Sequence, residues 1–378
     1  MTVKLAFAWH SLVHHKVRAV VSVGGISFSI LLVFVQVGLY DSVFRTATMV
    51  QDRLHYDIML VAPDYAFLAK PGTFPRRRLQ QARAVPGVES TAPLYVGIKP
   101  WRNQQSGRHW RLLILAFRPE DPVFLDPEIT EQAAALRKPD TVLLDRRTRP
   151  EFGAQDTGLI TELGHRDVEV AGQYTIGFGF LANGAVITSD QNFSRLYDGR
   201  PLEEVNVGLV KLRPGANGED VAKSLRGVLP ADVRVLTRAE QNAQERQYWA
   251  TQTSVGLING FGTVVATIVG IVILYQVLAT DLTNHLPEYA TLKAMGYTGR
   301  SLAQLVVLKV ILLGLLAYAP ALPLALAIYA ATHEATMLPI VMTGTRALAI
   351  LALTLVLSTL AALVSLRKLR TADPADLY

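Results

Sequence analysis

The residues whose types and spacing best suit a function lie in one short polar segment, 280–300, which reads TDLTNHLPEYATLKAMGYTGR. Within it, Pro287 and Glu288 stand where a helix would begin, and Lys293 and Gly296 stand where it would end. An early proline, an acid in the first turn, a base in the last turn and a glycine stop are signals of a short helix whose charges suit its dipole. Because a segment this short between two apolar stretches has no room for a catalytic domain, these helix signals predict a docking element.

Motifs that carry catalysis are absent from the sequence. No G-x-x-x-x-G-K-[ST] phosphate-binding loop occurs, and even the dipeptide Gly-Lys is missing. His333 and Glu334 lack a second histidine at the H-E-x-x-H spacing. The chain has no cysteine, which excludes disulfides, thiolate metal sites and a cysteine nucleophile. We therefore expect a non-enzyme that binds no cofactor or metal of its own.

The composition predicts a protein that is partly embedded in a membrane. Half of the residues (50%) are hydrophobic and only 18% are charged, which is apolar for a soluble protein and too polar for a wholly embedded one. The net charge of +6 is not concentrated in basic runs interleaved with aromatic residues, so nucleic acid is not an expected partner. We attribute the basic excess to membrane topology.

Four segments are apolar and long enough to span a bilayer, namely 20–40, 251–279, 302–331 and 347–366. A signal peptide is the alternative interpretation of the first, but its apolar run is too long and no small-residue cleavage pattern follows it. Lys309 is the one charge in the third segment. We expect Lys309 to lie near the inner surface and to extend its ammonium toward water, and a functional charge inside the membrane is the alternative.

Basic residues in the short flanks predict the orientation. They precede the first span, occur between the second and third, and follow the fourth, which places both termini, the segment 280–301 and the tail 367–378 in the cytoplasm. Residues 41–250 and the short loop 332–346 would then be extracytoplasmic. Residues 1–19 show helical apolar spacing around Trp9 and predict an amphipathic helix on the membrane lipids. His10, His14 and His15 would lie on its solvated face, with metal binding as the alternative.

The extracytoplasmic segment predicts an α+β domain with two lobes, the second mostly β, divided near residue 120. Strands are expected at 57–61, 88–99, 110–117, 168–171, 184–188, 205–212 and 233–236, and helices at 74–85 and 218–229. The stretch 118–153 is rich in proline and aspartate and is expected to be less regular. The fold class is thus a helical membrane protein with four spans and an α+β domain inserted between the first two.

A stalk helix is predicted from residue 238. Thr237 and Glu240 form a capping box, and no proline occurs between there and Pro287. One continuous helix of about 40 residues, roughly 60 Å long, could therefore run through the second span and act as a lever. A kink at Gly260 or Gly262 is the alternative.

Small residues recur along the second span, where close approach of two helices in lipid would be possible. They are Gly256, Gly260, Ala266 and Gly270. We predict that they form a homodimer contact.

The segment after the second span resembles a known family. LPEYATLKAMGY at 286–297 resembles the corresponding stretch of ABC transporter permeases of the FtsX/MacB superfamily, most closely the DevC-like branch. The resemblance extends to GISF at 25–28, VQVG at 35–38, the residues Leu143, Asp145 and Arg146 with RPEFG at 149–153, and DPA at 373–375.

This resemblance implies a permease of the bacterial inner membrane, multi-pass, that acts as a homodimer with separate ABC ATP-binding subunits, which carry ATP and magnesium. In such mechanotransmission exporters, ATP-driven movement is passed to a periplasmic membrane fusion protein and an outer-membrane TolC-like channel, with glycolipid or similar material as the substrate. The residues implied in contact with the ATPase are His285, Pro287, Glu288, Tyr289, Leu292, Lys293, Met295, Gly296 and Tyr297. Tyr289, Leu292 and Met295 would form an apolar stripe that docks into a groove of the partner, and a helix lying on lipid headgroups is the alternative.

Three other functions stay open at this point. The chain could be an FtsX-like regulator that activates a periplasmic hydrolase. It could be a lipoprotein-extracting permease, in which two different permeases pair. An intramembrane enzyme is the third alternative.

Overall fold

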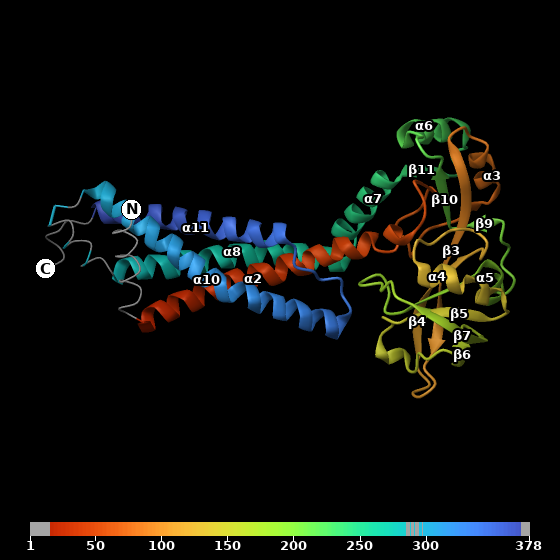
Figure 1. The fold of residues 1–378 in the computed structure, drawn as a ribbon, viewed down its shortest axis with the longest axis horizontal. Coiled ribbons are helices and arrows are strands. Elements are labelled where there is room, and N and C mark those ends of the chain that lie inside the picture. The colour runs from red at the N-terminus through yellow and green to blue at the C-terminus, as the bar shows by residue number, and fades with distance from the viewer. Residues whose placement is uncertain (1–15, 285–287, 289–290, 292–294, 297, 372–378) are drawn as a thin grey trace. The chain divides into compact units, whose positions relative to one another are not determined.

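The structure is a computed structural model that describes residues 16–284, 288, 291, 295–296 and 298–371 (Figure 1). The chain divides into two compact units. The first, here called the helical unit, contains residues 1–41, 258–335 and 340–378, and the second, here called the α+β unit, contains 42–257 and 336–339. The amphipathic helix predicted for 1–19 lies outside the described residues except at its end.

The described part of the helical unit is formed by four long helices: α2 (Lys16–Thr48), α8 (Ser254–Asn284), α10 (Gly299–Thr336) and α11 (Gly344–Thr371). Among the described residues, three stretches are long and apolar enough to cross a membrane, Ala19–Thr48, Ser254–Asp281 and Gly299–Thr336. The apolar stretch of α11, Gly344–Leu360, is shorter. The predicted fourth span at 347–366 therefore stays a prediction.

The helices share one apolar core and leave another apolar surface uncovered. Buried side chains from all four helices form the core, including Ile26, Phe34, Leu274, Val306, Leu313 and Ile350. On α8, Phe261, Val264 and Ile268 are exposed. Such a surface suits contact with lipid, where helices are held together by packing and buried polar contacts.

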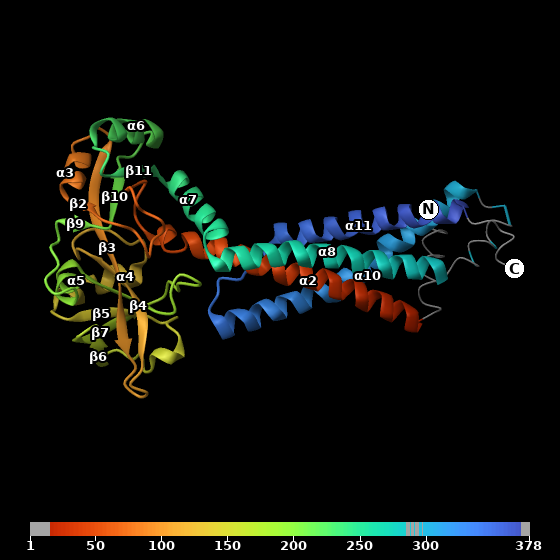
Figure 2. The same ribbon diagram turned by 180° about the vertical axis from the view of Figure 1, so that it is seen from behind.

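The α+β unit contains eleven strands and five α-helices. The strands are β1 (Ile58–Val61), β2 (Phe74–Pro75), β3 (Val88–Arg102), β4 (His109–Phe117), β5 (Thr141–Asp145), β6 (Ile160–Leu163), β7 (Arg166–Tyr174), β8 (Ala185–Ser189), β9 (Glu204–Val205), β10 (Val207–Leu212) and β11 (Arg234–Thr237). The helices are α3 (Arg77–Arg83), α4 (Pro127–Gln132), α5 (Asp190–Leu196), α6 (Gly218–Val228) and α7 (Arg238–Thr251), with short 3₁₀ turns η1 (Gln51–Arg53), η2 (Ala133–Arg137) and η3 (Pro150–Phe152). Both views show α3 and α6 at the end of the sheet that contains β10 and β11 (Figures 1 and 2).

Strand β3 is shared by two lobes, which corrects the predicted boundary near residue 120. The main sheet has the order β11-β1-β10-β3-β4-β8-β5-β7-β6, and Trp101 of β3 also pairs with Leu163 of β6. The first part of β3 pairs with β10 and the second with β4. Because β10 and β11 return to the first lobe from the far end of the segment, no single position in the sequence separates the lobes.

The stretch 118–153, which we expected to be irregular, contains a central strand. All five residues of β5 are buried, and β5 pairs with β7 and β8. A strand that is covered on both faces has an apolar sequence instead of an alternating one. The apolar run of β5 is short, and for this reason the sequence did not predict a strand there. The proline and aspartate residues around it belong to the neighbouring turns.

The predicted capping box is present, but the prediction of one continuous helix from residue 238 through the second span is wrong. The Thr237 N–H donates to the Glu240 carboxylate at 2.8 Å, and the Glu240 N–H donates to Thr237 Oγ1 at 3.3 Å. Helix α7 ends at Thr251 and α8 begins at Ser254, so the break falls at neither Gly260 nor Gly262.

A threonine side chain organises the break between α7 and α8. Thr253 Oγ1 donates to the Trp249 carbonyl at 2.7 Å and accepts from the Gly256 N–H at 3.0 Å. A hydroxyl that bonds the local backbone competes with helical hydrogen bonds. A Cβ on Gly256 would lie 1.8 Å from the Trp249 carbonyl oxygen, so this corner requires glycine.

Candidate functional site

The structure describes part of the predicted ATPase-contact segment. Glu288 is exposed, and Met295 is 64% exposed. The Met295 N–H donates to the Thr291 carbonyl at 3.0 Å, as in a helical turn, and Gly296 follows with a positive φ of 93°. The predicted glycine stop is therefore confirmed, because this left-handed conformation suits glycine. The other predicted contact residues, His285, Pro287, Tyr289, Leu292, Lys293 and Tyr297, lie outside the described residues.

Lys309 does not extend toward water as predicted. It is 4% exposed, and its Nζ lies 2.9 Å from Oδ2 of Asp281. The side chains of Lys309 and Asp281 are 5% and 10% exposed, respectively. A buried carboxylate within reach supplies the countercharge that water would otherwise provide, so the ammonium turns inward. This ion pair joins the end of α8 to α10, the two helices that flank the segment 285–298.

The small residues of α8 are engaged within the chain. Ser29 Oγ of α2 donates to the Gly270 carbonyl at 3.1 Å, and a Cβ on Gly270 would lie 3.1 Å from a methyl carbon of Val33. A Cβ on Gly260 would lie 3.3 Å from the Tyr40 ring, and Ala266 is buried. Gly256 occupies the corner after α7. The homodimer contact predicted for these four residues stays a prediction.

The residues of α2 that carry the family resemblance are packing positions. Ser27 Oγ donates to the Ala317 carbonyl of α10 at 2.8 Å. A Cβ on Gly38 would lie 2.1 Å from the Tyr329 hydroxyl, so α10 approaches α2 here as only glycine allows. The Gln36 carbonyl accepts from Thr263 Oγ1 at 3.3 Å. These residues therefore set how closely α8 and α10 approach α2.

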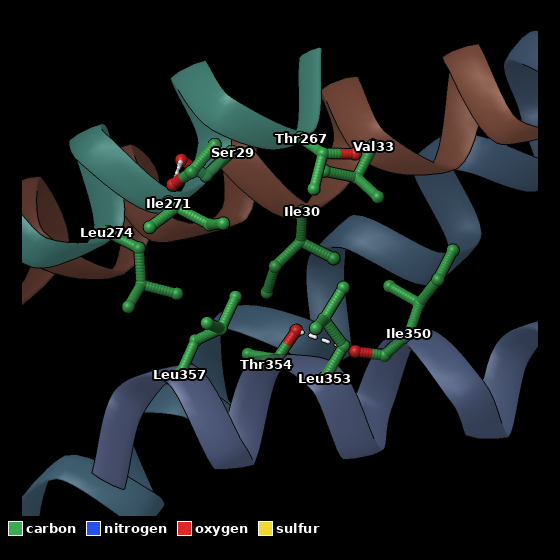
Figure 3. Close-up of a pocket in the computed structure, with 11 residues that line it drawn as sticks. Ser29, Ile30, Val33, Thr267, Ile271, Leu274, Ile350, Leu353, Thr354 and Leu357 are labelled. Carbon is green, nitrogen blue, oxygen red and sulfur yellow. Dashed lines mark hydrogen bonds between the residues drawn. The ribbon is translucent and has the colours of Figure 1, made fainter. Parts of the chain in front are cut away.

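A small apolar groove, partly open to its surroundings, lies between α2, α8 and α11 (Figure 3). Three hydroxyl residues line it: Ser29, Thr267 and Thr354. Each of these hydroxyls donates to a backbone carbonyl, of Gly270, Thr263 and Ile350 respectively. The groove consequently presents mostly hydrocarbon.

A second ion pair, which sequence reasoning missed, joins the buried Arg346 of α11 to the half-buried Asp41 of α2. Arg346 Nη2 lies 2.5 Å from Asp41 Oδ2, and Arg346 Nη1 donates to the Val341 carbonyl at 2.7 Å. The Tyr329 hydroxyl, near the same arginine, donates to the Phe34 carbonyl. The sequence does contain a signal for this ion pair, because Asp41 directly follows the first apolar segment and Arg346 directly precedes the last.

In the α+β unit, the motif at 143–153 builds a turn that holds a second loop. Asp145 accepts the Arg147 N–H at 2.9 Å and the Gly177 N–H at 2.6 Å. Burial raises the pKa of Asp145 to about 6, although these hydrogen bonds act against the rise. The Phe152 carbonyl accepts the Trp101 indole N–H at 3.1 Å. The motif is therefore structural, and it fixes the start of the loop 176–181.

The loop 176–181 meets two segments that continue into the long helices. Gly177 and Gly179 both have positive φ values, 73° and 50°. A Cβ on Gly179 would lie 2.3 Å from Oγ1 of Thr46 in α2 and 3.2 Å from Cδ of Pro339, which precedes α11. The Phe180 N–H donates to Thr46 Oγ1 at 3.4 Å. We did not predict this contact, although the repeated glycines of TIGFGF at 175–180 hint at close approach of the backbone.

A buried carboxyl group anchors α7. Glu245 is 1% exposed, and its Oε1 accepts from the Tyr65 hydroxyl, from Gln51 Nε2 at 3.2 Å and from Gln241 Nε2 at 3.3 Å. Burial raises the pKa of Glu245 to about 7, more than these hydrogen bonds lower it. These donors are neutral and no cation is among them, so burial prevails and favours the protonated form. Across the part of the chain that the structure describes, no three His, Cys, Asp or Glu residues gather as a metal site would require.

Two family models match the chain. The model described as MacB-like periplasmic core domain matches residues 19–228, and the model described as FtsX-like permease C-terminal matches residues 260–374. Among curated proteins, none matches the chain.

Three of the solved structures that the chain resembles show how distant the likeness is. The extracellular domain of YknZ, a noncanonic ABC-type transporter from Gram-positive bacteria, is 11% identical with a TM-score of 0.34, covering 48% of this chain and 99% of that one. The periplasmic region of MacB from Actinobacillus actinomycetemcomitans is 10% identical with a TM-score of 0.37, covering 54% and 97%. A domain of a putative permease protein from Porphyromonas gingivalis is 14% identical with a TM-score of 0.31, covering 49% and 89%.

Proposed function

The chain belongs to the FtsX/MacB superfamily of ABC transporter permeases, and on that premise we propose that it is the permease subunit of a mechanotransmission-type ABC exporter. It is a multi-pass membrane protein with a large α+β domain between its first two apolar helices. The family is a non-catalytic type of ABC permease subunit. In the proposed function, this chain converts ATP hydrolysis on another subunit into movement of its own helices.

The ATPase partner is inferred from the segment between α8 and α10. This chain has no phosphate-binding loop, so ATP and magnesium would bind to a separate ABC subunit. The observation that carries the proposal is that Glu288 and Met295 are exposed beside a glycine stop, between two apolar helices. An exposed short helix of mixed charge and apolar character is what a groove on a soluble partner can accept.

The rest of the proposal concerns the assembly. We place the chain in the bacterial inner membrane with both termini in the cytoplasm, because the basic residues gather in flanks on one side. A second copy of the chain would complete the permease. The α+β unit would contact a periplasmic fusion protein and, through it, a TolC-like channel that exports glycolipid, as in the DevC-like branch.

Reconstitution with the ATP-binding subunit encoded beside this chain tests the proposal. We expect the wild-type chain to stimulate ATP hydrolysis, and the double variant E288A/K293A to lose most of that stimulation. The matched control is E219A/K223A, which removes an exposed acid and base from α6 of the α+β unit. Equal stimulation by wild type and E288A/K293A would overturn the assigned contact. Capture of a hydrolase rather than a fusion protein by the α+β unit would favour the FtsX-like regulator instead.

A further inference from the structure

The buried face of α7 is mostly polar. It consists of Gln241, Glu245 and Trp249, which lie on one side of the helix because they are four residues apart. Of these buried residues only Trp249 is apolar, and it packs in a cluster with Val43 and Ala47. A helix whose apolar stripe is this narrow gains little from the burial of hydrocarbon. The polar contacts of Gln241 and Glu245 are therefore a large part of what holds α7 in the α+β unit.

Glu245 is the centre of these polar contacts. Its Oε1 accepts from the Tyr65 hydroxyl, from Gln51 Nε2 and from Gln241 Nε2. Gln241 Oε1 in turn accepts from the Tyr56 hydroxyl at 3.3 Å. The cluster thereby joins α7 to η1 and to the segments on either side of β1. Since Glu245 is 1% exposed, no solute reaches its carboxyl in this closed form, which favours a positioning role over a catalytic one.

The charged and titratable groups around this cluster leave Glu245 without a bonded cation. Tyr65 and Tyr56 face it from either side of β1, and burial raises the pKa of both phenols, so both stay neutral. Asp52 of η1 and Arg238 of α7 act on Tyr56, and the Arg238 guanidinium lies 4.3 Å from the centre of the Tyr56 ring. Among the described residues, the side chains that donate to the Glu245 carboxyl are thus all neutral. An ionised Glu245 would be a buried charge without a paired cation, which is unfavourable.

We propose that Glu245 is a proton-controlled latch, which fastens α7 to the α+β unit when it is protonated and favours release of α7 when it is ionised. Release means a local opening in which α7 leaves its place and the carboxyl reaches water, which relieves the cost of a buried charge. Only residues 252 and 253 separate α7 from α8, so the latch acts on the helix that leads into the second apolar span. The latch is a property of this chain, and its test does not depend on the proposed function.

Hydrogen exchange of the α7 backbone amides measures this opening in the full chain, purified in detergent. The pKa of Glu245 is about 7 while the carboxyl is buried, against an ordinary value of 4.5 in water. The closed form is therefore favoured most below pH 4.5, and this advantage is lost as the pH rises to about 7. After correction for the intrinsic pH dependence of exchange, the opening equilibrium of α7 should rise about 40-fold from pH 5 to pH 7. E245Q, which cannot ionise, should show equal protection of α7 at both pH values.

Two further comparisons separate the latch from general unfolding. The amides of α6 in the same unit are the control, because opening of that helix leaves Glu245 in place. Equal changes in α6 and α7, an unchanged α7 in the wild-type chain, or the same change in E245Q would each overturn the latch. Y65F removes a hydroxyl that lowers the pKa of Glu245, so it should move the loss of α7 protection to higher pH. If E245Q does not fold, Y65F decides, and an unchanged midpoint overturns the latch.

Discussion

The buried carboxyl groups of Asp281 in the helical unit and of Asp145 and Glu245 in the α+β unit are held in different ways. In the helical unit, Asp281 pairs with Lys309 and Asp41 pairs with Arg346. In the α+β unit, the buried carboxyls of Asp145 and Glu245 are instead held by neutral donors, and their pKa values rise. A buried charge must be paired or neutralised. Pairing ties two helices together, whereas protonation leaves a group that responds to pH.

The largest loss of stability is expected when the ion pair between Asp281 and Lys309 in the helical unit is removed. K309M removes the ammonium that lies 2.9 Å from the buried Asp281 carboxylate, which should cost about 3–5 kcal/mol of stability. The matched variant K138M removes an exposed lysine from its pair with Glu169 and should cost about 0–1 kcal/mol. Thermal unfolding of both purified variants in detergent measures the difference. Similar losses would mean that burial of the Asp281–Lys309 pair is energetically unimportant.

The second prediction is that the stability of the α+β unit depends on pH through the buried carboxyl group of Glu245. Burial raises the pKa of Glu245 from its ordinary value of 4.5 to about 7 in the folded chain, so between these pH values the folded state holds a proton that the unfolded state has lost. Stability of the α+β unit should therefore fall as pH rises from about 4.5 to about 7, by about 3 kcal/mol, and stay level above that.

Asp145, whose pKa is also raised, contributes in the same direction at lower pH. E245Q cannot titrate and should flatten most of the slope between pH 5 and 7. Chemical denaturation of the α+β unit within the full chain, followed at several pH values, measures the slope. An unchanged slope in E245Q would assign the pH dependence to other groups.

The third prediction asks whether close packing, independent of charge, also holds the helical unit together. G38A places a methyl group against the Tyr329 hydroxyl and should cost about 1–3 kcal/mol. G24A on the same helix is the control, because a Cβ there meets no atom within 4 Å. Thermal stability in detergent compares the two. If G24A were as harmful as G38A, helix flexibility and not the contact with Tyr329 would explain the loss.

The smallest effect is expected at the start of α7, where the substitution removes a single local hydrogen bond. T237A removes the hydroxyl that accepts the Glu240 N–H and should cost about 1 kcal/mol. T237S, which keeps the hydroxyl, is the control. Denaturant unfolding at constant pH measures both, and a loss in T237S equal to that in T237A would argue against capping.

Local signals in the sequence were sufficient for several features. The capping box at Thr237 and Glu240 and the stop at Gly296 depend on residues within a few positions of one another, and both are present. Strands β1 and β4 lie where strands were predicted from apolar runs, at 57–61 and 110–117.

Features that depend on distant residues could not be predicted in this way. The partner of Lys309 lies across the loop on another helix, so the sequence alone suggested that the ammonium reaches water. The break before α8 depends on the Thr253 side chain bonding the Trp249 carbonyl, and threonine is a weak helix breaker on average. The shared strand β3 became apparent only from the pairing of β10 and β11 in the first lobe.

In the proposed function, the segment between α8 and α10 contacts a separate ATP-binding subunit. A photo-crosslinking amino acid at Met295, which is 64% exposed, tests this claim in membranes that contain both chains. Val228 of the α+β unit, 60% exposed, is the matched control position. We predict an adduct with the ATP-binding subunit from position 295 and none from position 228. Adducts from position 295 that contain only lipid or a second copy of this chain would contradict the account.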